Sequence, residues 1–355
     1  MKQRVIGFDV ARTLAIFGMV IVNFKIVMSE QVGGNEWLIR FATLFEGRAS
    51  ALFVILAGVG ISFLTNKAYL SKDLAMLYTA RITLLKRALL LIVIGVIFMP
   101  IWEADILHYY GFYFLIATMI FTVSDQKLLI ITALLTLAFP VLLLLFDYEQ
   151  NWVWDTFTYQ NLWTMEGFIR HTLFNGIHPI FPWAAFLVFG IWLGRQNLAS
   201  TQTRKTLFMY ALLAWIGTEV LSYGLYHFFN NIDETDRAIF LTSAIPPMPQ
   251  YILAASSSAV VIIISCLTIA ERLPNNLIIK WLAQTGQLSL TLYVAHVIIG
   301  MGFLESIGML EQQPIEFALF SAGIFCILSI ILSVIWLQHF KMGPLEQVFR
   351  KMTRT

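Results

Sequence analysis

Residues 4–23 read RVIGFDVARTLAIFGMVIVN, and this stretch changes character partway along. It begins with charged residues and turns apolar after Arg12, yet the apolar run ends on the amide Asn23, with Lys25 close behind. If the stretch is a membrane helix, Asn23 lies about 17 Å beyond Arg12 along the axis, because each helical residue advances ~1.5 Å. The two polar groups would then nearly bridge a bilayer, and polar groups at that depth need a reason.

Composition places the chain among the polytopic helical membrane proteins. Hydrophobic residues make up 59% of its 355 residues and charged residues 12%, and the mean hydropathy is +0.77. Apolar runs recur along the whole sequence, for example LLLIVIGVIF at 89–98 and VVIIISCLTIA at 260–270. The expected fold is therefore an all-α integral membrane bundle of about ten helices, at 13–28, 49–65, 82–99, 106–123, 128–146, 179–194, 206–228, 248–270, 285–303 and 315–337.

The basic residues predict an orientation for this bundle. With the N-terminus inside, 18 of the 23 Lys and Arg residues fall in interior segments, and Lys25 lies within the first span. Only four fall outside, namely Arg40, Arg48, Arg170 and Arg237. The positive-inside rule then predicts that both termini are cytoplasmic. Because no linker, low-complexity tract or soluble segment interrupts the sequence, residues 1–355 are expected to form a single domain in the plasma membrane, the inner membrane of a bacterium.

Ionisable residues inside the spans are candidates for function, because burying one costs ~2.5–3.5 kcal/mol on insertion scales unless it finds a partner or water. His108 stands out among them. It follows Asp105 by three residues, so on a helix the carboxylate lies on the same face and could orient and charge the imidazole. A general acid–base pair and a snorkelling pair near the outer surface both fit this spacing.

The other histidines have plainer interpretations. His178 precedes Pro179 at the outer mouth of a span, where an interfacial turn is favoured. His296 lies near the middle of the span at 285–303, where a buried histidine bonded to a neighbouring helix is favoured over a catalyst. No chemical role is expected for the histidines near span ends, His171, His227 and His339.

Several kinds of site are not expected from the sequence. Cys266 and Cys326 lie inside apolar runs and read as buried hydrophobic residues. There is no Cys/His cluster at ligand spacing and no HExxH, so no metal is expected. A Walker loop, a GxGxxG after a strand and a GxSxG elbow are also absent, and nucleic acid is not an expected partner. Glu46 and Arg48 stand just before the second span, either as a surface ion pair or as ligands for a substrate.

The opening stretch resembles the first helix of the transmembrane acyltransferase superfamily. It is similar to the YeiB-like branch and to the catalytic domain of heparan-α-glucosaminide N-acetyltransferase, in which an R…D..RG approach leads into a helix ending in Asn. Further stretches fit the YeiB-like pattern in order, so the resemblance covers residues 4–350: FEGRASALFVILAGVG at 45–60, ADILHYYG at 104–111, HPIFPWAAFLVFGIWLGR at 178–195, GQLSLTLYVAH at 286–296 and GPLEQVFR at 343–350.

The resemblance implies that an acyl group, expected to be acetyl, moves from cytoplasmic acyl-CoA to a hydroxyl or amine acceptor, such as a sugar, at the outer face. Arg12, ten intervening residues and Asn23 match an Arg-x10-His/Asn motif, and Asp9 matches the acidic position before it. Thr13 stands where Gly is usual, which is expected to affect only local packing. In the heparan enzyme a histidine lies eleven residues beyond the Asn, but here that position is Gly34, so the base comes from elsewhere or the reaction differs.

These residues give a hypothesis for the reaction. Asn23 would donate a hydrogen bond to the acyl carbonyl or its oxyanion, while His108, oriented by Asp105, would take the proton of the acceptor. This requires Asn23 and His108 to face a shared polar space. Lys86 and Arg87 belong to a basic cytoplasmic cluster that would bind the phosphates of acetyl-CoA or another acyl-CoA, or attract anionic lipid. Glu46 and His178 are substitutes for the base, and the candidate substrate-binding residues are Asp9, Arg12, Glu46, Arg48, His178 and His296.

The expected partners are acyl-CoA, a small-molecule or glycan acceptor, membrane lipids and a second copy of the chain in a homodimer. Two alternatives stay open: a multi-pass transporter or exporter without acyl chemistry, which ten spans with polar residues at the midplane would also fit, and a relative that has lost catalysis and serves as a scaffold. Direct transfer and a covalent acyl-histidine route are not distinguished by the sequence.

Overall fold

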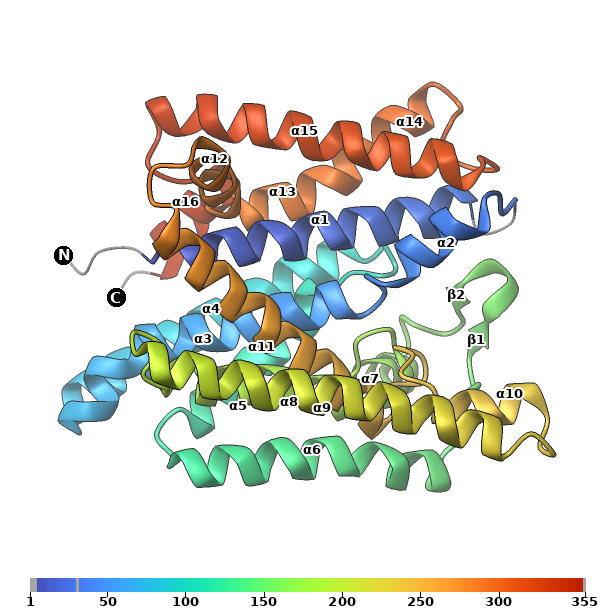
Figure 1. Ribbon diagram of the computed structural model, residues 1–355, viewed down its shortest axis with the longest axis horizontal. Helices are drawn as coiled ribbons and strands as arrows, with labels where there is room; N and C mark the ends of the chain where they lie inside the picture. Colours follow the sequence, from blue (N-terminus) through green and yellow to red (C-terminus); the bar gives the residue numbers. More distant parts are fainter. Residues whose placement is uncertain (1–4, 30–31, 354–355) are drawn as a thin grey trace. The chain divides into compact units, whose positions relative to one another are not determined.

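The computed structural model describes residues 5–29 and 32–353, and nearly all of its regular structure is helical (Figure 1). The described chain divides into two compact units. Unit 1 comprises residues 1–53 and 258–351, and unit 2 comprises residues 54–257 and 352–355. The all-α fold class is confirmed, and the expectation of a single domain stays a prediction. Of the basic residues used to predict orientation, Lys2, Arg4 and Arg354 lie outside the described residues.

Unit 1 is built around the first helix. That helix, α1, packs against α12, α13 and α15, and α15 runs along it (Figure 1). The helices of this unit are α1 (Ile6–Ser29), α2 (Glu36–Thr43), the beginning of α3 (Arg48–Ser71), the second part of α11 (Pro249–Arg272), α12 (Leu277–Gly286), α13 (Ser289–Ala295), the π-helix η4 (His296–Met301), α14 (Gly302–Ser306), α15 (Ile315–His339) and α16 (Pro344–Thr353).

Thr13 ties α1 to α12. Its hydroxyl donates to the carbonyl of Leu282 over 2.6 Å. One turn further along α12, a Cβ on Gly286 would collide with the carbonyl oxygen of Asp9, so only glycine allows the two backbones to approach this closely. Thr13, which stands where Gly is usual in the family, therefore makes a packing contact between α1 and α12.

Unit 2 contains the remaining helices and a small hairpin, in which Trp152 pairs with Tyr159. Helix α4 packs on α5, and α8 packs on both α5 and α6. The elements are the rest of α3, α4 (Leu74–Phe98), α5 (Leu107–Ile120), α6 (Asp125–Leu145), β1 (Trp152–Val153), the 3₁₀ helix η1 (Trp154–Thr156), β2 (Thr158–Tyr159), α7 (Met165–Arg170), the π-helix η2 (His171–Asn175), α8 (Ile180–Arg195), α9 (Thr201–Phe228), α10 (Glu234–Arg237), the 3₁₀ helix η3 (Ala238–Phe240) and the first part of α11.

Polar side chains cap the beginnings of several of these helices. The side chains of Asp73, Ser124 and Ser200 accept hydrogen bonds from backbone N–H groups in the first turns of α4, α6 and α9. The first N–H groups of a helix have no partner within it, so each of these caps fixes where an apolar run begins. The apolar runs form the helices, and these short polar residues determine where the helices begin.

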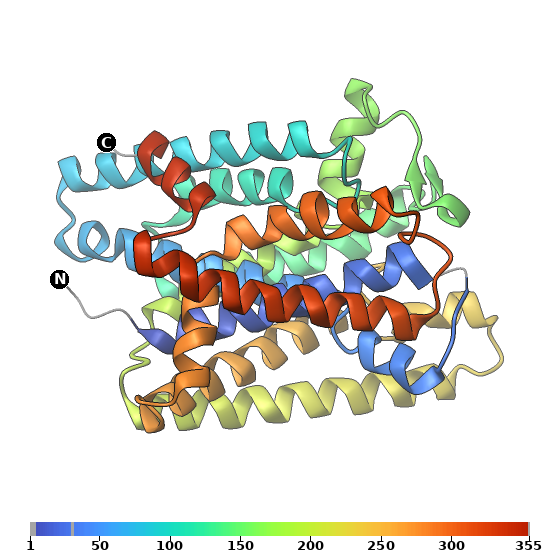
Figure 2. The same cartoon turned by 90° about the horizontal axis from the view of Figure 1, so that it is seen from above.

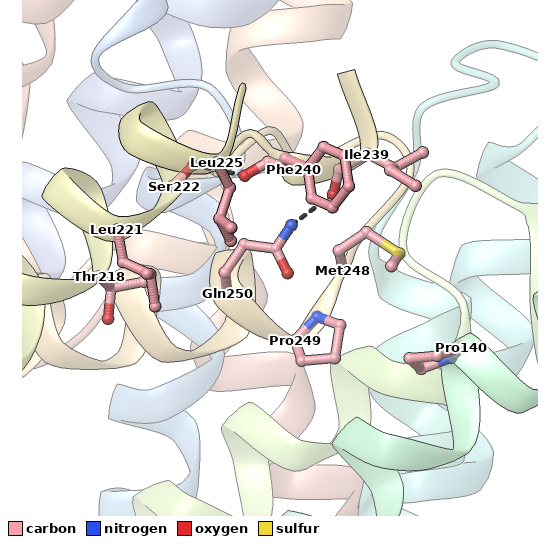
Figure 3. Close-up of a pocket in the computed structure, with 10 residues that line it drawn as sticks. All are labelled: Pro140, Thr218, Leu221, Ser222, Leu225, Ile239, Phe240, Met248, Pro249 and Gln250. Atoms are coloured by element: carbon pink, nitrogen blue, oxygen red, sulfur yellow. Dashed lines mark hydrogen bonds between the residues drawn. The ribbon is translucent and has the colours of Figure 1, made fainter. Parts of the chain in front are cut away.

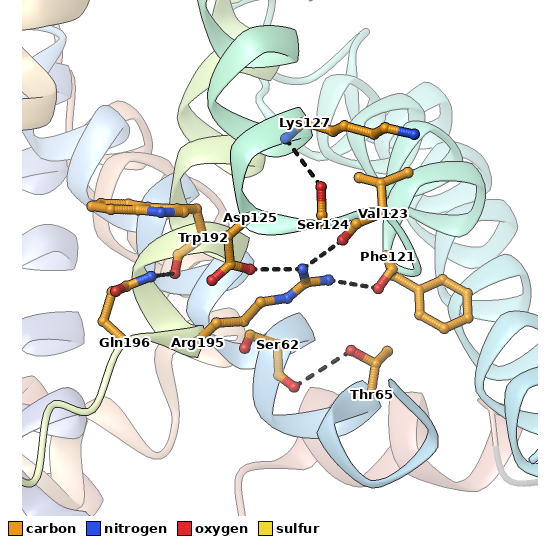
Figure 4. Close-up of polar contacts among 10 residues, drawn as sticks. All are labelled: Ser62, Thr65, Phe121, Val123, Ser124, Asp125, Lys127, Trp192, Arg195 and Gln196. Carbon is orange, nitrogen blue, oxygen red and sulfur yellow. Dashed lines mark hydrogen bonds and ion pairs between the residues drawn. The ribbon is translucent and has the colours of Figure 1, made fainter. Parts of the chain in front are cut away.

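Arg195 connects the ends of three helices in unit 2 (Figure 4). The guanidinium donates to the carbonyls of Phe121 and Val123, 2.7 Å each, and to the carboxylate of Asp125 at 3.0 Å. It also lies over the ring of Tyr69, 3.9 Å from the centroid. These two carbonyls lie just beyond the end of α5, so this side chain satisfies backbone acceptors between α5 and α6 and joins α5, α6 and α8 at one end.

Within the described residues, seven helices are long and apolar enough to cross a membrane, or eight if one bent pair counts as a single span. The protein is therefore an integral multi-pass membrane protein. The count of ten is not confirmed. The spans expected at 82–99 and 106–123 fall on α4, which carries Arg81, Lys86 and Arg87, and on α5, which has only 14 residues. The cytoplasmic location of both termini stays a prediction.

That orientation can be tested with single cysteines in a Cys266→Ser/Cys326→Ser background. Asp236 and Lys205 are both exposed, and the charge pattern puts Asp236 outside and Lys205 inside. A membrane-impermeant thiol reagent should label Asp236→Cys in intact cells and Lys205→Cys only after the membrane is permeabilised. The reverse pattern would invert the topology.

The contact between α3 and α8 is expected to be intolerant of larger side chains. A Cβ on Gly58 would collide with the carbonyl of Leu187, and one on Gly190 with the carbonyl of Ile55. Gly190→Leu should lower the free energy of unfolding by about 1–3 kcal/mol in a denaturant titration, because the obstructing atoms are backbone. The matched control is Gly217→Leu on α9, where no atom lies within 4 Å, and this change should have little effect. Equal losses would contradict the packing.

Candidate functional site

A broken span in unit 2 carries two of the histidines. The segments Met165–Asn175 and Ile180–Arg195 meet at 52° across a four-residue break. Such irregular backbone is tolerated within a membrane only where the protein satisfies its polar groups or where it lines a cavity. Here Tyr113 donates its hydroxyl to the carbonyl of His178 over 2.5 Å, and the indole N–H of Trp152 donates to the carbonyl of Asn175 over 2.6 Å. The break is therefore held by specific bonds.

Asp105 and His108 form a buried pair at the start of α5, and both side chains are fully inaccessible to solvent. The Asp105 Oδ2 accepts from the backbone N–H of His108 and from its ring Nδ1, 3.2 Å each. The same carboxylate thus caps the helix and orients the ring. Because a carboxylate accepts, Nδ1 carries a hydrogen, and in the neutral ring Nε2 carries the lone pair. His108 Nε2 is buried and has no hydrogen-bond partner among the described residues.

His171 lies next to the Asp105–His108 pair, although no role was predicted for it from the sequence. Its ring stacks on that of His108, with centroids 6.1 Å apart and planes 18° apart. The Tyr109 hydroxyl lies 3.0 Å from His171 Nδ1. His171 is only 2% exposed, and it begins the π-helix η2, an irregularity often found at functional sites. The expectation that His171 has no chemical role stays a prediction, but its burial beside His108 makes it a further candidate for the site.

A tyrosine from the hairpin covers His171. Tyr159 lies with its ring centroid 4.7 Å from that of His171, and its hydroxyl donates to the side-chain oxygen of Asn175 over 2.9 Å. Burial raises the pKa of the Tyr159 phenol above its ordinary value, so this hydroxyl stays a donor over the physiological range. Asn175 in turn donates to the carbonyls of Tyr148 and Gln150, which anchors the hairpin loop to the broken span.

His178 lies in the turn that the sequence predicts, but it is buried. Its side chain packs edge-on against Trp183, with ring centroids 4.4 Å apart, and lies 6.0 Å from the ring of Tyr109. Within the part of the chain that the structure describes, nothing hydrogen-bonds to His178 Nδ1. We refer to Asp105, His108, Tyr109, His171 and His178 as the three-histidine cluster. Two buried ring nitrogens of this cluster have no hydrogen-bond partner among the described residues.

Unit 1 contains a second polar centre, formed by Asn23 of α1 and His296. The Asn23 Nδ2 lies 2.9 Å from His296 Nε2, and the histidine is completely buried. His296 Nδ1 bonds to the carbonyl of Tyr293, which can only accept, so Nδ1 carries the hydrogen. Nε2 therefore accepts from the Asn23 amide, which fixes the orientation of that amide. The interpretation of His296 as a buried residue bonded to another helix agrees with this geometry.

The remaining polar residues of α1 also find partners within unit 1. Arg12 donates to Asp9 over 2.6 Å, and Asp9 is almost fully buried whereas Arg12 is partly exposed. Lys25 forms an ion pair with Glu46. Glu46 therefore faces a cation on α1, which the sequence did not predict, and Arg48 begins α3 half-buried.

Gly34 does not leave room for the histidine of the heparan enzyme. Its φ of +137° lies in a region that side chains rarely adopt, and a Cβ there would come within 2.8 Å of both Glu316 and Ile315. The backbone at position 34 therefore suits glycine and not histidine. The single substitution Gly34→His would not fit there.

The residues expected to bind the carrier lie on α4. Lys86 is exposed, and Arg87 is half-buried. The Nε of Arg87 is buried, and no group in residues 5–29 or 32–353 hydrogen-bonds to it. A half-buried guanidinium with a free donor is suited to an anion such as a phosphate.

An apolar cavity of about 290 Å³ lies elsewhere in unit 2, beside α9 and the start of α11 (Figure 3). Its few polar groups are used internally, since Ser222 donates to the carbonyl of Phe240 and Gln250 donates to the carbonyl of Ile239. None of the residues singled out in the sequence lines it. No group of three or more His, Cys, Asp or Glu within the described ranges is arranged to hold a metal ion.

The structure thus brings together Asn23 with His296 in unit 1, and Asp105 and His108 with His171 and His178 in unit 2. Asn23 and His108 belong to different units, so the shared polar space stays a prediction.

Comparison with known families agrees with both the fold and these residues. Residues 4–229 match the family described as heparan-alpha-glucosaminide N-acetyltransferase, catalytic. The chain belongs to this family. Residues 193–355 match a second family, described as protein of unknown function (DUF418). The resemblance inferred from the sequence motifs, to the YeiB-like and heparan-α-glucosaminide N-acetyltransferase families, is confirmed. No curated protein and no solved structure matches the chain.

Membership in the heparan-α-glucosaminide N-acetyltransferase catalytic family indicates a membrane acetyltransferase-like function. The matched segment contains α1 with Asn23 and the whole three-histidine cluster, whereas His296 lies beyond it, in the segment that matches only the second family.

The bond between Asn23 and His296 can be tested by a double-mutant cycle on stability. Asn23→Leu leaves the buried Nε2 of His296 without a partner and should lower the free energy of unfolding by about 1–3 kcal/mol. The double variant Asn23→Leu/His296→Leu should be more stable than the sum of the single losses predicts, by about 1 kcal/mol. Strict additivity would contradict the bond.

Proposed function

We propose that the protein transfers an acyl group, most simply acetyl, from a cytoplasmic acyl-CoA to a hydroxyl or amine acceptor at the outer face of the plasma membrane. The observation that carries this proposal is the state of His108, whose Nδ1 bonds to the buried Asp105 while its buried Nε2 has no partner among the described residues. A ring held in this way presents a lone pair to a substrate proton. Family membership supplies the reaction type.

In the proposed reaction, the acceptor oxygen or nitrogen attacks the thioester carbonyl carbon and gives its proton to His108 Nε2. The carbon–sulfur bond breaks, and the thiolate of coenzyme A leaves and is protonated. Asp105 stabilises the positive charge that His108 acquires, and His171 with Tyr109 holds the ring in place. Because a thioester is already activated, alignment and proton removal are the main tasks of the protein.

Asn23 is proposed to donate to the oxygen of the acyl carbonyl as it becomes an oxyanion. One amide hydrogen of Asn23 bonds to His296, so the direction of the second is fixed before the substrate arrives. Such preorganised donors stabilise developing charge without reorganisation. His296 then acts as a positioning residue. Arg87 and Lys86 would bind carrier phosphates, and Asp9, Arg12, Glu46, Arg48 and His178 stay candidates for substrate contact.

The two centres can be tested by thiol release. Purified protein with acetyl-CoA and a pool of sugars and amines should release free thiol. His108→Ala should lower the rate by about 100-fold or more, because it removes the general base. Asn23→Ala should lower the rate by a similar factor, because it removes a preorganised donor.

The matched control is His339→Ala, which removes an exposed histidine at the end of α15 and should leave the rate unchanged. Full activity in both His108→Ala and Asn23→Ala would remove the site assignment. A broken span is also typical of transporters, so substrate accumulation in vesicles without any acyl-CoA would favour transport over transfer.

A further inference from the structure

The C-terminal helix α16 is amphipathic and begins next to the end of a membrane span. Helix α15 is a candidate span that ends at His339, and α16 begins at Pro344. Five residue steps reach at most about 18 Å, so α16 starts close to the membrane surface. Figure 2 shows α16 leaving the end of α15 at a steep angle rather than continuing it.

The turn between the two helices is fixed by side chains. The indole N–H of Trp336 donates to the carbonyl of Met342 over 2.9 Å, and its ring stacks on Phe340 with centroids 4.1 Å apart. A Cβ on Gly343 would meet the side chains of Glu346 and Thr291, so a larger residue where the chain enters α16 would displace the Glu346 carboxylate. The direction of α16 is therefore set by the protein.

One stripe of α16 is apolar and exposed. Pro344, Val348 and Met352 follow one another at intervals of four residues and so lie on one face, and Val348 and Met352 are 47% and 59% exposed. Lys351 is exposed beside this stripe, and the exposed Lys341 lies just before the helix, whereas Arg350 follows Glu346 by four residues and so lies on the other side. An apolar stripe with basic neighbours at the level of the headgroups is suited to the surface of a bilayer that contains anionic lipid.

The opposite side of α16 holds the beginning of α13. The N-cap residue of α13, Leu288, provides no side-chain cap. Glu346 Oε1 instead accepts from the backbone N–H groups of Leu290 at 2.7 Å and Thr291 at 3.2 Å, and Oε2 accepts from the Thr291 hydroxyl at 2.6 Å. That hydroxyl accepts in turn from the N–H of Leu345. A cap for the helix that leads into His296 is thus supplied by α16.

We propose that α16 docks on the surface of an anionic bilayer through Val348, Met352, Lys351 and the preceding Lys341, and that Glu346 transmits this docking to the first turn of α13. Docking holds α16 in one position and thereby keeps the Glu346 cap closed. Each of the two basic side chains favours the docked state by about fivefold, or about 25-fold together. The proposal does not depend on acyl transfer.

The test compares hydrogen exchange of the full chain in nanodiscs of phosphatidylcholine with nanodiscs that also contain phosphatidylglycerol. We expect slower exchange in α16 and at residues 288–296 with phosphatidylglycerol, at low ionic strength, where charges are least screened. The variant Lys341→Gln/Lys351→Gln should lose this difference in both segments. Glu346→Gln should keep it in α16 and lose it at Leu290 and Thr291, because the amide is a weaker acceptor than the carboxylate.

A matched control removes two exposed lysines elsewhere, with Lys72→Gln/Lys127→Gln, and should keep the full effect. No lipid dependence in the unmodified protein, or an equal loss in the control, would overturn the docking. Protection that follows protein concentration instead of lipid charge would assign the stripe to a second copy of the chain. A lipid effect that persists at residues 288–296 in Glu346→Gln would overturn the coupling.

Discussion

The hydrogen bond between the Asp105 carboxylate and the His108 ring is the interaction on which the candidate site depends. Both groups are fully buried in an apolar bundle, where an unsatisfied carboxylate would be costly. Asp105 meets that constraint by accepting from the first turn of α5 and from the imidazole at once. The same contact that stabilises the helix start also decides which ring nitrogen carries the lone pair. The hydrogen bonds of Asp105 therefore both stabilise the start of α5 and prepare the His108 ring to accept a proton.

The second centre follows the same rule with different groups. His296 is also completely buried, and its two nitrogens are taken by the carbonyl of Tyr293 and the amide of Asn23. His171 and His296 each begin a π-helix, the first within a broken span and the second in the span that starts at α13. A π-helix therefore accompanies a buried histidine in both units. Its irregular backbone leaves carbonyl groups to which side chains can donate hydrogen bonds.

The sequence predicted most of the helices, because apolar runs are local features. It also predicted the Asp105–His108 contact from their spacing of three residues, although Asp105 precedes α5 and reaches the first turn of that helix as a cap. The bond between Asn23 and His296 joins residues 273 positions apart, and no local pattern can specify such a partner. His171 was missed because position near a span end does not reveal burial. Its spacing of seven residues before His178, across a Gly and ahead of a Pro, was the available signal.

The count of ten spans is not confirmed, and the difference lies at α4 and α5. Apolar composition marks both helices as membrane-like, but α5 is short and α4 carries three basic residues. The two helices pack on one another, and at Gly95 and Gly111 their backbones approach closely. Whether α4 and α5 cross the membrane stays a prediction.

The central claim, that His108 acts as the base, can be tested most directly by chemical rescue. Truncating the side chain in His108→Ala leaves a space where imidazole from solution can replace the missing ring beside Asp105. Added imidazole should restore acetyl-CoA thiol release in His108→Ala and should not restore it in Asn23→Ala. If imidazole restores neither variant, or both equally, His108 does not carry the proton of the acceptor.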